Sequence, residues 1–170
     1  MGKLRLPTNL SRRRARLAAP FVKDCPAMRV TAKADYAVRA AIELAAAADG
    51  PVKGQAISET QGIPLRFLEN ILAELRHAGI VHSQRGAEGG YWLSRPATEI
   101  SIADVIRAVE GPLASVRSEP PEELAYQGSA LALREVWLAL RTNIRAVLEQ
   151  VSLADVVAGE LPAEVTALLR

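Results

Sequence analysis

The most regular pattern in this chain is a run of apolar residues near its C-terminal end. They are Leu133, Trp137, Leu140, Ile144, Val147 and Val151, separated by four, three, four, three and four positions. This spacing is the seam of a heptad repeat, and it predicts one long amphipathic helix. A single small domain does not need so narrow a stripe, so we interpret it as a homodimer interface. A helix inside a bundle is the alternative, and a second stripe of Leu131, Leu138 and Leu148 could pack on the helix's own domain.

The composition is that of a soluble globular protein with room for one core and an appendage. The chain has 170 residues, of which 49% are hydrophobic and 24% charged. No run of 18 apolar residues occurs, so no membrane span is expected. The single cysteine, Cys25, can form neither an internal disulfide nor a cysteine-based metal site from the chain's own thiols. These features favour a cytoplasmic location.

Basic residues are concentrated at the start of the chain. Residues 1–27 hold seven Lys or Arg against Asp24 alone, a charge of +6 within a net charge of +2. Three prolines and the lack of an amphipathic stripe predict that this leader is disordered. It is either an arm that touches DNA phosphates or the product of a misassigned start, with Met28 as the true first residue. A nucleic-acid partner should meet the first part of the chain.

Residues 28–110 predict a winged helix-turn-helix domain, so the expected fold is mainly α with a small β-hairpin. Helical patterns run from Thr31 to the break at Asp49-Gly50-Pro51, from about Lys53 to Gln61, and from Pro64 to about Ala78. Gly62 suits the left-handed position that closes the second helix, and Pro64 suits the first position of the third. Two short strands, Ile80–Arg85 and Tyr91–Ser94, follow around a glycine-rich turn. In this order of elements the third helix enters the major groove.

The rest of the chain divides into three predicted parts. A helix over Ser101–Val109 begins with a capping box of Ser101 and Asp104. Residues 111–128 are rich in Pro, Glu and small side chains and are interpreted as a flexible loop. Residues 129–170 hold the heptad helix and a C-terminal tail with a short helix.

Signals for catalysis or metal binding are weak. His77 and His82 are the only histidines and have no cysteine or histidine at metal-ligand spacing. The segment 86–90 lacks the Lys-Ser/Thr of a phosphate-binding loop and joins two strands, so it is interpreted as a wing tip. No nucleophile and base can be assembled. We therefore expect no enzyme activity, no metal and no cofactor.

The third helix carries side chains suited to reading bases. With its leucines and Ile71 turned inward, its outer face shows Arg66, Glu69, Asn70, Ala73 and Arg76. Arg reads guanine, Asn reads adenine and Glu accepts from cytosine N4. Phe67 could touch a thymine methyl group or fill the core, and Arg85 at the wing is placed to enter a minor groove. A solvated charged face is the alternative.

Several segments, taken together and in order, make the chain resemble the Rrf2 family of bacterial transcription regulators. They are Met28–Ala40, Ile57–Glu59 with Gln61–Ile63, Phe67–Glu69, Leu75–Arg76, Gly79–Val81, Arg85–Gly86 with Gly89–Tyr91, and Val105–Glu110. The resemblance implies a homodimeric winged-helix protein, usually a repressor, that binds a pseudo-palindromic operator on double-stranded DNA. It assigns base reading to Arg66, Phe67, Glu69 and Asn70, and the minor groove to Arg85. Arg76, Lys33 and Tyr36 complete the expected DNA-binding set.

Many members of this family hold an iron–sulfur cluster with three cysteines in the loop before the dimer helix. The corresponding residues 111–128 contain none. Asp35 falls on the position of an acidic cluster ligand, and Arg134 replaces a histidine ligand. The resemblance therefore implies a cluster-free regulator that answers to a small molecule, a protein effector or nothing. Two alternatives remain: an adaptor dimer that has lost specific DNA binding, and an iron–sulfur sensor completed by Cys25.

Overall fold

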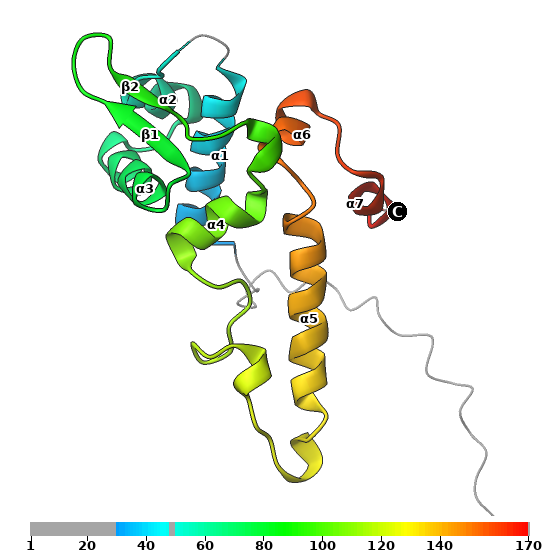
Figure 1. The fold of residues 1–170 in the computed structure, drawn as a ribbon. Helices are drawn as coiled ribbons and strands as arrows, with labels where there is room; N and C mark the ends of the chain where they lie inside the picture. Colours follow the sequence, from blue (N-terminus) through cyan, green and yellow to red (C-terminus); the bar gives the residue numbers. More distant parts are fainter. Residues whose placement is uncertain (1–29, 48–49, 170) are drawn as a thin grey trace, which may run out of the picture.

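The computed structural model describes residues 30–47 and 50–169, so the basic leader with Cys25 lies outside the described residues. The elements are α1 Ala32–Ala46, α2 Gly54–Gln61, α3 Leu65–His77, β1 Val81–Gln84, β2 Gly90–Leu93, α4 Ile102–Glu110, α5 Leu133–Leu148, α6 Leu153–Ala158 and α7 Ala163–Ala167 (Figure 1). Short 3-10 turns lie at Ala97–Glu99, Pro121–Glu123 and Gly128–Ala130. The order is the predicted one, with three helices, a hairpin and further helices. No described helix is long and apolar enough to cross a membrane.

Helix α1 lies at the centre of the core. It contacts α3, α4, α6 and β2, and it presents four buried alanines and Leu44 to them. Small side chains let neighbouring helices approach closely, and the larger residues of α3 fill the space between them. The buried residues of α3 are Leu68, Ile71, Leu72 and Leu75. This packing fixes α3 against the body along one face and leaves its other face to solvent.

The turn between α2 and α3 has the geometry that its glycine predicts. Gly62 has φ +62°, and its N–H and that of Ile63 both donate to the carbonyl of Ser58. The prediction for Pro64 is wrong by one position, because it is the N-cap and not the first helical residue. Its ψ of 123° is extended, and its carbonyl accepts from the N–H groups of Phe67 and Leu68, at 2.9 and 3.0 Å.

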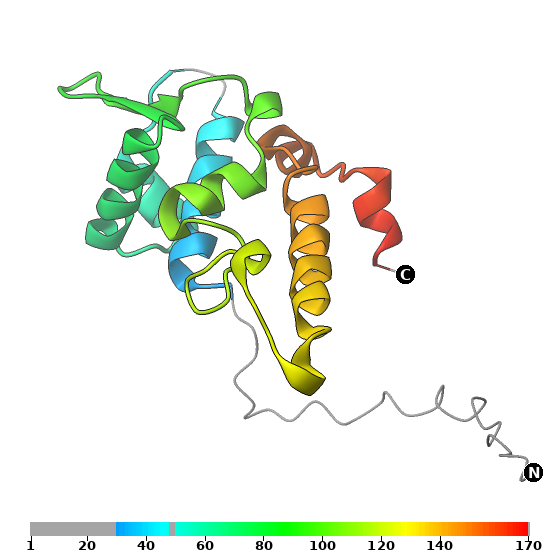
Figure 2. The same ribbon diagram turned by 60° about the horizontal axis from the view of Figure 1, so that its bottom comes forward.

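The hairpin is antiparallel and is anchored to the segment before α2. Val81 pairs with Leu93 and Gln84 with Gly90. Val52 forms an isolated bridge beside the hairpin, since it exchanges two backbone hydrogen bonds of 2.8 Å with Tyr91. The loop between the strands projects away from the helices as a wing (Figure 2). The first predicted strand was too long by one residue at each end, and the second was placed one residue too late.

The predicted capping box of α4 is present, since Ser101 Oγ accepts from Asp104 N and Asp104 Oδ2 accepts from Ser101 N, both at 3.1 Å.

The segment between α4 and α5 is more structured than a flexible loop would be. Within 111–128, Leu124 and Pro121 are buried, and Trp137 Nε1 donates to Tyr126 OH at 3.0 Å. These contacts hold the segment against α5.

The heptad helix is shorter than predicted, and Val151 is not part of it. Helix α5 ends at Leu148, and Val151 is only 6% exposed within its own subunit. Its carbonyl accepts from the N–H of Ile102 at 2.9 Å, beside a β-bridge between Ser101 and Ser152. Val151 therefore has little exposed surface for a second copy to cover, which argues against its expected place in a dimer interface. Leu131 also lies outside α5 and is 66% exposed, so it does not pack on the domain in the way that the second stripe would allow.

Candidate nucleic-acid interface

The outer face of α3 carries the side chains that were expected to read bases. Arg66, Glu69, Asn70, Ala73 and Arg76 are all exposed, and they lie opposite the buried leucines. Within the described residues, the side chains of Arg66, Glu69 and Asn70 make no hydrogen bond or ion pair with the rest of the chain. Their donors and acceptors are therefore free to meet base edges or phosphates.

Phe67 is held at the edge of this face by an aromatic neighbour. Its ring lies 5.8 Å from that of Tyr36, at an interplanar angle of 82°, which is an edge-to-face pair. Phe67 remains 39% exposed, so it does not fill the core. Of the two roles considered for Phe67, the exposed one fits this placement. Tyr36 supports Phe67 from α1, and the pair brings the start of α3 against the first half of α1.

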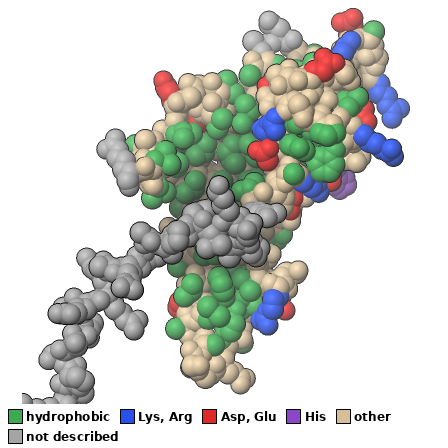
Figure 3. Space-filling model, turned by 180° about the vertical axis from the view of Figure 1, so that it is seen from behind, with side chains coloured by type: hydrophobic (Ala, Val, Ile, Leu, Met, Phe, Trp, Pro, Cys, Tyr) green, Lys and Arg blue, Asp and Glu red, His purple; other side chains and the backbone are tan. Residues whose placement is uncertain are grey.

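The wing lies next to the C-terminal end of α3. Arg76 Nη1 donates to Ser83 Oγ in β1 at 3.3 Å, and Arg85 is exposed where the chain leaves β1. Seen from behind, Lys and Arg side chains, with some acidic ones, gather along the edge that carries α3 and the wing (Figure 3). Glycines allow the tight wing base, because a Cβ on Gly90 would lie 2.6 Å from the carbonyl oxygen of Val52.

Lys33 has a different environment from the one expected for a DNA contact. Its Nζ lies 2.7 Å from Glu74 Oε2 and 2.7 Å from the carbonyl oxygen of Val109. The ammonium thus joins α1 to α3 and to the last turn of α4, where a cation also suits the helix dipole. These contacts argue against the predicted role for Lys33, since DNA would have to replace both of them.

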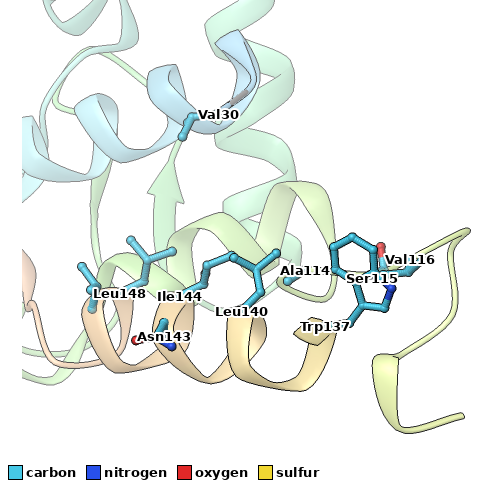
Figure 4. A pocket seen from close by; sticks show the side chains of 10 residues that line it. Val30, Ala114, Ser115, Val116, Trp137, Leu140, Asn143, Ile144 and Leu148 are labelled. Carbon is cyan, nitrogen blue, oxygen red and sulfur yellow. The ribbon is translucent and has the colours of Figure 1, made fainter. Parts of the chain in front are cut away.

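Helix α5 presents an apolar groove on the other side of the molecule. None of its 16 residues is buried, although it carries the heptad side chains. The groove has a volume of about 750 Å³, and Figure 4 shows the lining residues of α5 in a row, with the segment 114–116 beside Trp137 at one end. Its lining is Val30, Ala114, Ser115, Val116, Trp137, Leu140, Asn143, Ile144, Val147 and Leu148. Leu133, at the start of α5, does not line it.

The opposite wall of this groove was not predicted from the sequence. Ala114, Ser115 and Val116 lie in the segment interpreted as a loop, and small residues there carry no periodic signal.

The two positions that correspond to cluster ligands in the family both form hydrogen bonds within the chain. Asp35 Oδ2 accepts from Arg39 at 3.3 Å, and Arg134 donates to the carbonyl of Glu122 at 3.0 Å.

The described residues do not fit an iron–sulfur cluster. Such clusters are held mainly by cysteine thiolates, and 111–128 holds no cysteine. Nor do the residues at 30–47 and 50–169 contain a group of three or more His, Cys, Asp or Glu that could hold a metal ion. The guanidinium of Arg134 has no lone pair to offer a metal at the position where other members place a histidine.

Comparison with known proteins finds one matching family model and several similar transcription regulators. Residues 30–159 match the model of the Rrf2 family, described as iron-dependent transcriptional regulators. The chain is 54% identical over 142 residues, 83% of this chain and 88% of the relative, to Rv1287 of Mycobacterium tuberculosis, classed among HTH-type transcriptional regulators. It is similar to the structure of CymR, the global cysteine regulator of Bacillus subtilis, with a TM-score of 0.67, 32% identity, and 78% and 98% coverage of the two chains. The structure of IscR from T. potens matches with a TM-score of 0.64, 35% identity, and 78% and 88% coverage.

Proposed function

Because the chain belongs to the Rrf2 family of HTH-type transcriptional regulators, we propose that it represses transcription as a cluster-free homodimer on a pseudo-palindromic operator. The observation that carries this proposal is the outer face of α3. Arg66, Glu69 and Asn70 are exposed there and unpaired within the described residues. The opposite face of the helix is buried in the body through Leu68, Ile71, Leu72 and Leu75. A helix held in this way and flanked by a wing suits insertion into a major groove.

Four exposed side chains of α3 have natural partners among the bases. The Arg66 guanidinium can donate two hydrogen bonds to guanine, and the Asn70 amide can pair with adenine N6 and N7. Glu69 accepts from cytosine N4, and the partly exposed ring of Phe67 suits a thymine methyl group. Arg85 on the wing is the candidate for a narrow minor groove, where the negative potential is strongest. Phosphate contacts fall to Arg76.

The homodimer is supported by the state of α5. Helix α5 is a 16-residue amphipathic helix with no buried residue, so the described residues leave part of its apolar stripe uncovered. The groove beside it is lined by Trp137, Leu140, Ile144 and Val147, and it has the apolar character of a subunit interface. A second copy that covers this face would give two α3 helices related by a two-fold axis, which is what a pseudo-palindrome requires.

We propose a cluster-free protein because the described residues hold no group of His, Cys, Asp or Glu that could bind a metal. A small-molecule or protein effector would then supply regulation. The segment 111–128 is a reasonable place for it, since that segment forms part of the groove and contacts α5 through the hydrogen bond between Tyr126 and Trp137.

In vitro selection of bound DNA from a random library, followed by fluorescence anisotropy on the selected site, tests the proposal. We expect a selected sequence with two-fold symmetry, binding of two copies per site, and affinity that falls steeply with salt. A parent protein that binds all sequences equally would overturn the proposal. A stable protein partner captured in the absence of any selected site would favour the adaptor alternative.

A further inference from the structure

Arg39, a half-buried residue of α1, contacts Gln61 at the end of α2 and the ring of Tyr36. Both contacts lead to the start of α3. We propose that Arg39 is a positioning residue for DNA recognition, an inference that rests on the proposed function. Its guanidinium fixes the end of α2 and the ring of Tyr36 relative to α1, and thereby fixes the first turn of α3.

The first set of contacts reaches Gln61, the last residue of α2. Arg39 Nε donates to Gln61 Oε1 at 2.9 Å, and Arg39 Nη2 donates to the backbone carbonyl of Gln61. The planar fork of a guanidinium can hold both acceptors at once, which an ammonium cannot do with the same geometry. Two atoms of one residue are therefore fixed by one side chain from another helix.

A cation near the carbonyl of Gln61 should stabilise the end of α2. It belongs to the last turn of α2, where backbone carbonyls have no partner within the helix. The last turn of α2 contains no basic residue of its own. Arg39 supplies this positive charge from α1, and the charge interacts favourably with the negative end of the α2 dipole. Only three residues, 62–64, then separate Gln61 from the start of α3, so the position of this carbonyl strongly constrains α3.

The amide of Gln61 is oriented by a second residue of α1. Gln61 Nε2 donates to Glu43 Oε1, so the other end of the amide, Gln61 Oε1, faces Arg39. An amide has one acceptor end and one donor end, and this orientation satisfies both neighbours. Glu43 and Arg39 lie four residues apart on the same side of α1. Together they hold the side chain of Gln61 between them.

The second set of contacts leads to Phe67. The Arg39 guanidinium lies 5.6 Å from the centroid of the Tyr36 ring, and Tyr36 packs edge-to-face against Phe67. Arg39 Nη1 also donates to Asp35 Oδ2 at 3.3 Å, which fixes the third nitrogen of the fork. Arg39 thus reaches α3 by two routes, through the turn after Gln61 and through the aromatic pair. All of its nitrogens are used within the described structure, which argues against a phosphate contact.

Two variants and a charge-matched control test this inference on the selected operator. Arg39→Ala removes the fork, and Gln61→Ala removes its side-chain acceptor without a change of charge. The control is Arg145→Ala, because Arg145 on α5 loses the same charge and pairs with Glu149 four residues away, as Arg39 pairs with Asp35. Fluorescence anisotropy at several salt concentrations gives affinity for the operator and for a scrambled duplex. Thermal unfolding checks that each variant is folded.

We expect Arg39→Ala to weaken operator binding by about tenfold relative to Arg145→Ala, with binding to the scrambled duplex unchanged relative to that control. Gln61→Ala should also lower the specificity ratio, and the double variant should lose less than the product of the two single effects. The slope of log affinity against log salt should match that of Arg145→Ala, since both variants keep every phosphate contact. If Arg39→Ala does not fold, the same comparison with Gln61→Ala decides the question.

The other outcomes separate this inference from the proposed function. A parent that selects no sequence would overturn both. A selective parent whose two variants bind like Arg145→Ala would overturn the positioning role alone. A weaker Arg39→Ala protein with a salt slope shallower by about one would show that Arg39 is a direct phosphate contact, which also overturns it.

Discussion

Arg76 and Ser83 join the end of α3 to the wing, with Arg76 Nη1 3.3 Å from Ser83 Oγ. The two elements proposed to contact DNA are therefore tied to each other as well as to the core. The recognition helix and the wing should approach the duplex as one unit, so that a base contact by α3 and a minor-groove contact by Arg85 depend on the same orientation.

Arg66 and Arg76 should respond differently to removal. Arg66→Ala should cost about 1–3 kcal/mol of operator binding and relax base preference at one position of each half-site, because the variant cannot make the bidentate hydrogen bonds to guanine. Arg76→Ala should weaken binding to all sequences and make the salt slope shallower by about one for each phosphate that the variant leaves unneutralised. Anisotropy titrations against the operator and its single-base variants make this measurement. Loss of specificity in Arg76→Ala but not in Arg66→Ala would reverse the two assignments.

The apolar groove along α5 should be the subunit interface. Leu140→Glu places a carboxylate in the groove and should convert the dimer to a monomer, because a buried Leu contributes about 2 kcal/mol and an unpaired buried charge costs more. Val136→Glu is the matched control, since Val136 is on the same helix, is 56% exposed and does not line the groove. Sedimentation equilibrium distinguishes the two. A dimeric Leu140→Glu protein would show that the copies meet elsewhere.

Substitution by alanine should have opposite effects on stability at Gly90 and at Gly54. Gly90→Ala should destabilise the protein by about 1–3 kcal/mol, because the new Cβ would lie 2.6 Å from the Val52 carbonyl oxygen that pairs with Tyr91. Gly54→Ala should be neutral or stabilise by up to about 1 kcal/mol, since its Cβ would meet Tyr91 at an ordinary 3.6 Å. Urea unfolding of both variants tests this. Equal stability of the two would mean that the Val52 bridge is not rigid.

Asp155 should make stability depend on acid pH. Hydrogen bonds from the Ser152 hydroxyl and backbone N–H, at 2.7 and 2.8 Å, hold the pKa of the Asp155 carboxyl below its usual range. The unfolded chain therefore binds the proton more readily, so the stabilisation is present above the unfolded pKa, about 4, and is lost as pH falls through the lower folded pKa. Asp155→Asn should lower the melting temperature at pH 7, and the difference should shrink toward pH 3. A difference that stays constant with pH would contradict the capping role.

The parts of the fold that follow from local chemistry could be predicted from the sequence. Gly62 must close α2 because few other residues adopt a positive φ readily, and Ser101 with Asp104 must cap α4 because their spacing matches the free N–H groups. The outer face of α3 follows from the period of its leucines. In each case one residue type has one physical reason to stand at that position.

The sequence was least informative where partners distant along the chain decide the environment of a residue. Val151 continues the heptad spacing, but its backbone pairs with the start of α4, and Ser152 and Asp155 begin a new helix there. The spacing of Ser152 and Asp155, the same as that of Ser101 and Asp104, was the signal that could have ended the heptad at Leu148. Lys33 was expected to contact DNA because of its charge, but in the structure it pairs with Glu74 of another helix. No local pattern shows either contact.

The bridge between Ser101 and Ser152 should also limit which duplexes the molecule can accept. Backbone bonds from Ile102 to Val151 and from Leu153 to Ile100 tie the segment that follows α5 to the start of α4. In a two-fold pair, the separation and helical phase of the two half-sites would then be built into the protein. One extra base pair at the centre turns one half-site by roughly 35° about the duplex axis. We expect such a spacer change to abolish simultaneous engagement of both halves, even when every contacted base is kept.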